Sequence, residues 1–371
     1  MAGKLHERVI EPGLKLTTYF EERDRVGDRF LADALFDVYE RDAMRTSVLL
    51  RGVAGFGEHH RMHTDRLLTL SENLPAVSIA VDTRERIEHA LGDVLEIATS
   101  GLVTVERAQL ASEALEQVEL TDPPGTTIRL TLYGGRAVRS GGEAGYVAAV
   151  RALREAGAGG ASVLLAVDGT LHGERRRARF FARNAAVPLM LEAVGESPAI
   201  GSVLPTLARL LDQPVATIER VRICKSEGRH LSEPHSVPAP DTARQHDPAA
   251  GGPMRQKLTV YAEEQDHSNG RPLYAELVRR LHVNGAAGVT VLRGVRGFYG
   301  ERGMVADSML RIRRNVPVHA VIIDTPKRIQ RLWPMIDAVT YKHGIVTSEL
   351  VPATHALSGA EPREMLALDD S

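Results

Sequence analysis

The chain repeats itself at a fixed distance, and this repeat limits its fold more than any other feature of the sequence. A shift of 242 residues aligns Lys15–Glu22 (KLTTYFEE) with Lys257–Glu264 (KLTVYAEE). The same shift aligns Val48–Phe56 (VLLRGVAGF) with Thr290–Phe298 (TVLRGVRGF). The register holds from residue 15 to residue 88, so the sequence predicts two copies of one domain.

The gap between these two copies is long enough for a third. At an offset near 114, Leu130–Tyr133 (LTLY) matches Leu16–Tyr19 (LTTY), and Ser162–Leu165 repeats Ser47–Leu50. We therefore predict three copies, the middle one degenerate: copy 1 (14–110), copy 2 (127–224) and copy 3 (256–352). The composition of residues 225–255 predicts a flexible linker, and residues 353–371 are predicted to form a disordered tail.

Each copy shows the same order of expected elements. In copy 1 a strand over 14–20 precedes a helix with apolar residues at Leu31, Leu35 and Val38, and strands follow over 47–53 and 76–81. A second helix and a closing strand follow in each copy. The N-caps expected for this helix in copies 1, 2 and 3 are Thr83, Ser197 and Thr325. This βαββαβ order predicts an α+β fold of three tandem ferredoxin-like domains that form an intramolecular pseudo-trimer. Three separate beads, or assembly between chains, are the alternatives.

Composition excludes several classes of protein. The 371 residues carry a net charge of −2, which gives no overall field for nucleic acid or an anionic membrane. The single cysteine, Cys224, excludes a disulfide framework and is expected to be a buried structural thiol. No signal sequence or apolar span is recognisable, so we expect a cytoplasmic protein.

Several short motifs resemble those of a known family. They include Gly270–Tyr274 (GRPLY), Val291–Phe298 (VLRGVRGF) and His63–Thr64. Together they resemble the PII-like family catalogued as domain of unknown function 190. The resemblance implies ferredoxin-like domains similar to the trimeric PII signalling proteins. Those relatives bind nucleotides or other small effectors in clefts between subunits, and report through a long loop that docks on transporters, channels or enzymes. Genes of this family are often found beside fluoride-exporter genes, which suggests a fluoride exporter as one such partner.

The loop that follows the second strand is the main candidate for ligand binding. Glycines permit close approach of backbone N–H groups to an anion, and an arginine at a strand end can bind phosphate. The candidate ligand-binding residues are Arg51, Gly52, Gly55, Phe56, Gly57, Arg293, Gly294, Gly297 and Phe298. The alternative interpretation is that the glycines only let the chain leave the sheet while Arg51 pairs with an acidic neighbour.

Other charged groups have weaker interpretations. The arginines of copy 2 could dock an acidic partner surface or lie on a solvated face: Arg175, Arg176, Arg177 and Arg179. Glu21 and Glu22 could serve acid–base chemistry, but pairing with nearby arginines is favoured. His59 and His63 have metal-ligand spacing that copy 3 does not repeat, so no metal site is predicted.

The expected function is regulatory and not enzymatic. The chain would bind a small anionic effector, with an adenine nucleotide as the candidate, in one or two clefts between copies and require no cofactor. Loops 55–65, 168–185 and 297–307 would then present themselves to a transporter, channel or enzyme. The alternatives are a ligand-independent adaptor of a membrane transporter, such as a fluoride exporter, and a nucleotide- or metal-dependent enzyme.

Overall fold

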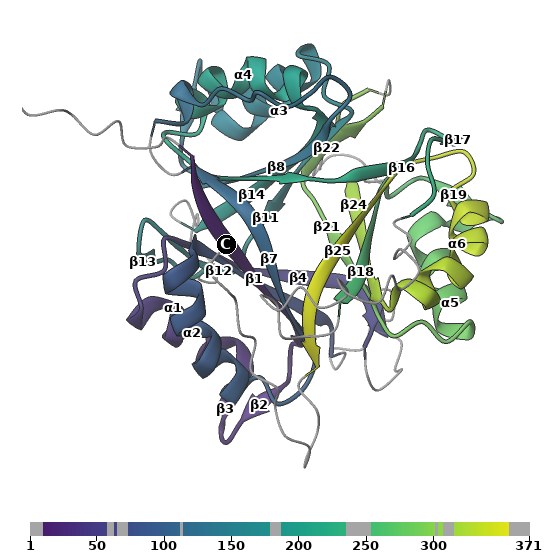
Figure 1. Ribbon diagram of the computed structural model, residues 1–371, viewed down its shortest axis with the longest axis horizontal. Coiled ribbons are helices and arrows are strands. Elements are labelled where there is room, and N and C mark those ends of the chain that lie inside the picture. Colours follow the sequence, from purple (N-terminus) through teal and green to yellow (C-terminus); the bar gives the residue numbers. More distant parts are fainter. Residues whose placement is uncertain are drawn as a thin grey trace, which may run out of the picture.

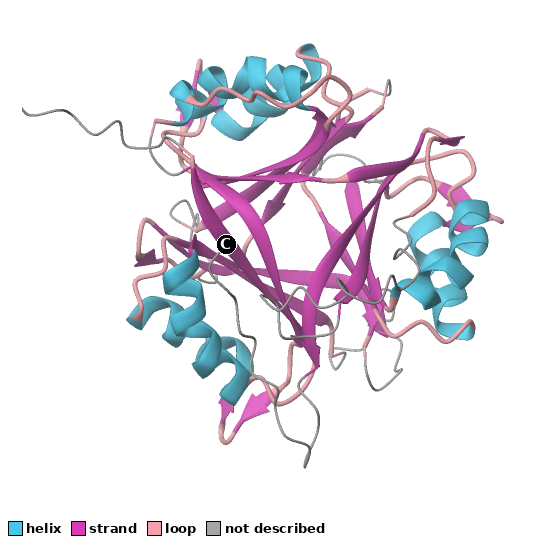
Figure 2. Ribbon diagram, viewed as in Figure 1, coloured by secondary structure: helices cyan, strands magenta, loops and turns pink. Residues whose placement is uncertain are grey.

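The computed structural model describes residues 10–57, 63–64, 73–111, 114–178, 187–234, 254–300, 303–306 and 315–355. Three pairs of helices occupy the outside of the molecule, and the strands of all three copies fill the space between them (Figures 1 and 2). No helix within these residues is long and apolar enough to cross a membrane. Residues 59 and 179 of the predicted sites, and parts of the three predicted partner loops, lie outside the described residues.

The described part of copy 1 contains two helices, four long strands and three strands of two residues. Its elements are β1 (Glu11–Glu21), β2 (Arg25–Val26), β3 (Arg29–Phe30), α1 (Leu31–Arg41), β4 (Thr46–Phe56), β5 (His63–Thr64), β6 (Pro75–Thr83), α2 (Arg84–Ile97) and β7 (Leu102–Ala111). The order of helices and long strands agrees with the sequence expectation. β4 is longer than expected, and its additional residues Ala54–Phe56 pair with a strand of copy 3.

Copies 2 and 3 repeat this order. Copy 2 and its flanks contain a 3₁₀ turn (Leu115–Gln117), β8 (Thr127–Gly135), β9 (Arg139–Ser140), β10 (Glu143–Ala144), α3 (Gly145–Glu155), β11 (Gly160–Leu165), β12 (Asp168–Leu171), β13 (Glu174–Arg175), β14 (Pro188–Glu196), α4 (Ser197–Leu210), β15 (Val215–Arg220), β16 (Arg222–Ser226) and β17 (Arg229–His230). Copy 3 contains β18 (Met254–Glu263), β19 (His267–Ser268), β20 (Arg271–Pro272), α5 (Leu273–Val283), β21 (Val289–Arg293), β22 (Arg296–Tyr299), β23 (Val305–Ala306), β24 (Pro317–Asp324), α6 (Pro326–Val339) and β25 (Ile345–His355).

The predicted fold class is wrong. The described part of the chain is mostly β, with 46% of it in strands, and eight antiparallel strands close into a barrel. The closed ring runs β1–β6–β4–β21–β24–β18–β25–β7 and back to β1, so strands of copies 1 and 3 share one sheet. Three tandem ferredoxin-like domains would each keep a sheet of their own, and the physical reason that they do not is edge pairing. Each exposed strand edge forms backbone hydrogen bonds with a neighbouring copy.

Two kinds of strand make these contacts between copies. The second strand of each copy pairs with its counterpart, as β4–β21, β4–β12 and β11–β22 show. The closing strands pair as β7–β15, β16–β25 and β25–β7. β16 includes Lys225 and Ser226, so the first residues of the predicted linker form a strand, while residues 235–253 lie outside the described part. The predicted tail also begins as strand, because β25 continues to residue 355.

A buried ring of six charged side chains lies where the three copies meet. The first strands supply the cations Lys15, Arg129 and Lys257, and the closing strands supply the carboxylates Glu106, Glu219 and Glu349. Lys15 Nζ lies 2.5 Å from Glu219 and 2.8 Å from Glu106. Lys257 Nζ lies 2.5 Å from Glu106 and 3.0 Å from Glu349.

Arg129 completes the ring. It donates two parallel hydrogen bonds to Glu349, at 2.6 and 2.7 Å, and a third to Glu219 at 3.2 Å. The ring therefore alternates in sign, and every carboxylate lies between two cations. Burial by itself would raise the pKa of Glu349, but Arg129 and Lys257 bring it down to about 2. The pKa of Glu106 is lowered in the same way by Lys15 and Lys257.

We expect Glu106→Gln to lower the free energy of unfolding by about 3–5 kcal/mol, because it leaves Lys15 and Lys257 short of a carboxylate in a buried site. Urea denaturation at pH 7 measures this value. Glu88→Gln is the matched control, because its pair with Arg84 is on the surface and contributes at most about 0.5 kcal/mol. Equal losses in the two variants would contradict a structural role for the ring.

The same ring predicts an acid-sensitive fold. Carboxylates with pKa values below the ordinary 4.5 contribute stability that is complete above pH 4.5. That contribution falls as the pH drops from 4.5 toward the folded value, about 2 for Glu349, at up to about 1.4 kcal/mol per pH unit for each group. Urea midpoints measured between pH 6 and pH 2.5 test this expectation. A Glu349→Gln variant should show a shallower decline, and an identical pH profile would refute it.

Candidate functional site

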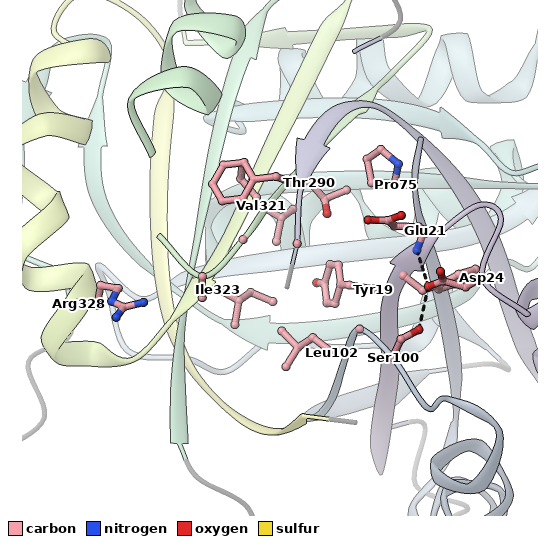
Figure 3. A pocket seen from close by; sticks show the side chains of 17 residues that line it. Tyr19, Glu21, Asp24, Pro75, Ser100, Leu102, Thr290, Val321, Ile323 and Arg328 are labelled. Carbon is pink, nitrogen blue, oxygen red and sulfur yellow. Dashed lines mark hydrogen bonds between the residues drawn. The ribbon is translucent and has the colours of Figure 1, made fainter. Parts of the chain in front are cut away.

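A pocket of about 270 Å³ lies between copies 1 and 3 (Figure 3). Copy 1 supplies the end of β1, the end of β4 and the start of β7, and copy 3 supplies β21, β24 and α6. The lining residues are Tyr19, Phe20, Glu21, Asp24, Phe56, Gly57, Pro75, Ser100, Gly101, Leu102, Ala287, Gly288, Val289, Thr290, Val321, Ile323 and Arg328. The pocket therefore lies between two copies of the repeat.

The pocket is open because glycine stands on both facing strands. Gly57 follows the last residue of β4, and a β-carbon built there would meet nothing within 4 Å. Gly288 precedes β21, opposite the end of β4. The interface between copies 3 and 2 has Tyr299 and Gly160 at these positions, and the interface between copies 2 and 1 has Leu171 and Thr46. Side chains thus fill the corresponding space at the other two interfaces.

The polar groups of the pocket divide between its two ends. At one end Asp24 accepts hydrogen bonds of 3.0 Å from the Glu21 backbone N–H and from the Ser100 hydroxyl. At the other end stands Arg328, whose Nε lies 3.9 Å from Asp324 (Figure 3). Tyr19 and apolar side chains lie between them. Burial raises the pKa of Tyr19, so its phenol stays neutral at physiological pH.

Both predicted arginines of the ligand loop contact carboxylates of their own copy. Arg51 pairs with Glu22, and Arg293 Nη2 donates to Glu264 at 2.6 Å. The Arg51 side chain is 58% exposed, and it is not among the residues that line the pocket. This is the pairing that the alternative interpretation of the loop expected. Ligand binding by Arg51 and Arg293 stays a prediction.

The predicted loop glycines allow copies to approach one another. A β-carbon on Gly55 would lie 2.3 Å from the Val289 carbonyl oxygen, and one on Gly297 would lie 2.3 Å from that of Ala161. A β-carbon on Gly52 would lie 2.6 Å from the ring of Pro75, and one on Gly294 would lie 2.7 Å from that of Pro317, each within one copy. Side chains at Gly55 and Gly297 would therefore force β4 away from β21, or β22 away from β11.

The two phenylalanines pack into the cores of other copies. Phe56 ends β4 of copy 1 but belongs to the apolar cluster of copy 3, where its ring lies 5.1 Å from that of His282. Phe298 of copy 3 is fully buried in the cluster of copy 2. Of the nine predicted ligand residues, Phe56 and Gly57 line the pocket.

Two of the predicted docking arginines, Arg175 and Arg177, contact copy 1. Arg175 Nη1 lies 2.8 Å from Asp37 and its Nη2 lies 2.9 Å from Asp168, so it joins α1 to copy 2. Arg177 pairs with Asp33 at 2.9 Å. Arg176 pairs with its near neighbour Glu174. The Arg175 guanidinium contacts carboxylates of two copies. Partner docking by Arg175, Arg176 and Arg177 stays a prediction.

The buried carboxylates and the single cysteine are two further groups that could carry chemistry. Glu106, Glu219 and Glu349 bring carboxylate oxygens within 4.8 Å of one another, a spacing that suits a metal ion. Three cations already neutralise these carboxylates, which leaves no net charge to attract a metal ion.

Cys224 is fully buried in the core of copy 3, and burial raises the pKa of its thiol to about 12, as expected for a structural cysteine.

Sequence reasoning missed Arg328, Gly288 and Asp24 as pocket residues. One signal was available in the repeat itself. Under the 242-residue shift Gly57 aligns with Tyr299, while Phe56 aligns with Phe298. A small residue in place of a large one, beside an unchanged neighbour, marks a position where the two copies have different surroundings.

Comparison with known sequences identifies the family. The sequence model of domain of unknown function 190, described as "Uncharacterized ACR", matches residues 13–110, 127–223 and 255–353. Because these matches cover most of the chain, the protein belongs to this family and contains three tandem copies of its domain, as predicted.

Two curated relatives are single-copy proteins in length. A UPF0166 protein of Methanocaldococcus jannaschii is 30% identical over 89 residues, which are 24% of this chain and 82% of the relative. A UPF0166 protein of Aquifex aeolicus is 28% identical over 93 residues, 25% of this chain and 86% of the relative. Among solved structures, an aspartate kinase from Synechocystis aligns with 92% of this chain and 52% of its own, at 11% identity and a TM-score of 0.24, too low to support any inference.

Phe298→Ala should lower the free energy of unfolding by about 3–5 kcal/mol, because it removes a buried ring that joins two copies. Arg51→Ala should cost no more than about 1 kcal/mol, since its ion pair is largely exposed. Urea unfolding of both variants separates the structural residues of the loop from those free to bind a ligand. A small loss for Phe298→Ala would show that the contact between copies contributes little.

Proposed function

We propose that this protein is a regulatory, non-enzymatic effector-binding protein whose effector occupies the pocket between copies 1 and 3. The observation that supports this is the combination of an open contact between copies with polar groups at both ends and an apolar middle. Ligand sites typically combine an apolar lining with a few oriented polar groups. A ligand there would touch two copies at once and would stabilise one arrangement of their strands.

Arg328 makes an anionic effector the best candidate. It is the cation of the described pocket lining, and it occupies the first turn of α6, where the helix dipole adds partial positive charge. Glu21 and Asp24 at the other end would accept hydrogen bonds from hydroxyl or amine groups. An adenine nucleotide offers an anion at one end and such donors at the other.

The size and charge of the pocket favour a monophosphate. About 270 Å³ is at the small end of ligand pockets, which usually measure about 300–1,000 Å³. Two carboxylates face one arginine, so extra phosphates would bring negative charge toward Glu21 and Asp24. We therefore expect AMP to bind more tightly than ADP or ATP.

The position of the pocket supports a regulatory role. Gly57 borders the pocket and belongs to the loop (55–65) that is predicted to contact a partner. Binding next to Gly57 would restrain that loop where it leaves β4. A transporter, channel or enzyme is the proposed target. None of the described residues that line the pocket is a histidine, cysteine or lysine, which favours binding over catalysis.

Titration calorimetry with AMP, ADP, ATP and adenosine tests the proposal. Arg328→Gln should weaken AMP binding by about 10- to 100-fold, the value of a charge-assisted hydrogen bond, and should leave adenosine binding unchanged. The matched control is Arg331→Gln, an exposed arginine of the same helix that does not line the pocket. A double variant, Arg51→Ala with Arg293→Ala, tests the sequence-based assignment, which expects loss of binding.

The outcomes separate the alternatives. Loss of AMP binding in the double variant, with Arg328→Gln unaffected, would place the anion at the strand ends. No binding of any nucleotide would overturn the anionic-effector proposal and favour a ligand-independent adaptor. Hydrolysis of a bound nucleotide would instead identify an enzyme.

A further inference from the structure

At the interface between copies 3 and 2, an aromatic ring fills the position equivalent to the pocket between copies 1 and 3. Tyr299 is 4% exposed, and its ring lies on the backbone of Gly160, where a β-carbon would come within 2.6 Å of Tyr299 Cδ1. The ring centroid lies 5.7 Å from that of Tyr261 and 6.4 Å from that of His319. Ile345 packs in the same apolar cluster.

The walls around this ring recur in the open pocket. At the filled interface, strand pairing places Gly160 opposite Tyr299. At the open interface Val289 pairs with Phe56, so the next residues along the two chains, Gly288 and Gly57, face each other. Under the 242-residue shift Tyr261 corresponds to Tyr19. Strand pairing places Ile345 opposite Tyr261, as it places Leu102 opposite Tyr19. Tyr19, Leu102, Gly57 and Gly288 all line the pocket. The two sites thus have a glycine, a tyrosine and an aliphatic residue in equivalent positions. They differ in that the Tyr299 ring fills one of them.

We propose that the pocket between copies 1 and 3 binds a planar aromatic ring, which lies over Gly288 as the Tyr299 ring lies over Gly160, and that Tyr299 blocks a second site of the same kind. The inference rests on the proposed function for the identity of the site, and adds the ligand class and the number of sites. A ring over a glycine backbone, beside Tyr19, gains close contact that a branched aliphatic group would not. One chain binds one ligand.

The two sites differ in their charged end. The third residue of α6 is Arg328, whereas the third residue of α4 is Ala199, so a methyl group stands where the open pocket has a guanidinium. The blocked site, if opened, would therefore take the ring of a ligand but would not hold its anion. AMP and an uncharged aromatic compound should distinguish the two sites.

The test counts binding sites for 4-bromophenol, a tyrosine side-chain analogue whose bromine is located by anomalous diffraction from soaked crystals. Wild-type protein should show one bromine over Gly288. Tyr299→Gly should show a second bromine over Gly160, and Tyr299→Phe, which keeps the ring, should show one. Gly57→Tyr should lose the site over Gly288, and it places a tyrosine where the repeat already tolerates one.

Solution measurements keep the inference independent of any single variant. Thermal unfolding of Tyr299→Gly should be rescued by p-cresol to a greater extent than that of wild-type protein. Calorimetry with AMP should give one site in wild type and in Tyr299→Gly, and none in Gly57→Tyr. If Tyr299→Gly does not fold, loss of bromophenol binding in Gly57→Tyr still supports the ring site, and retention there overturns it.

The results distinguish failure of this inference from failure of the proposed function. Bromophenol sites that follow the expected pattern, without nucleotide binding, would keep the aromatic site and reject the nucleotide. Nucleotide binding that Gly57→Tyr leaves unchanged would keep an effector protein and reject this pocket as the ring site. A wild-type protein that binds 4-bromophenol nowhere over Gly288 would overturn the inference directly.

Discussion

The structure depends on the buried ring of three cations and three carboxylates at the meeting point of the copies. Every cation contacts carboxylates from two copies: Lys15 reaches Glu219 of copy 2, and Lys257 reaches Glu106 of copy 1. Removing one charge from such a site leaves its partners unpaired in a medium of low dielectric. No copy can leave the assembly without exposing this imbalance, so the ring holds the three copies in one register.

Covalent fusion lets the three interfaces around this ring become different. In an assembly of identical chains a substitution would change all interfaces together. Here Gly57 opens one interface, Tyr299 fills the second, and Leu171 with Thr46 fills the third. The central charges are retained in kind in all three copies, with Arg129 in place of a lysine in copy 2. The shared centre provides stability, and the divergent edges leave one pocket for a ligand.

Much of the local structure followed from patterns within each copy. The helix containing Leu31 and Leu35 was predicted from its period, and the Thr325 hydroxyl caps α6 by accepting from the Arg328 backbone N–H. The cluster around Phe56 and Phe298 did not follow, because these rings pack against helices of another copy. No pattern within a copy records which neighbour a strand end will reach. Arg51 forms an ion pair with Glu22 of the same copy, as one of the two interpretations of the loop expects.

The sequence by itself determined the repeat, the family, the order of elements and the residues of the two glycine-rich strands. These are local properties, set by periodicity, capping and the residue types that a strand accepts. Only the tertiary structure decided that the strands join across copies into a closed barrel, and that a pocket exists at the interface of copies 1 and 3. Both depend on which strand edges meet and on which side chains face each other there. Such pairings form between residues up to hundreds of positions apart, as between Phe56 and Val289.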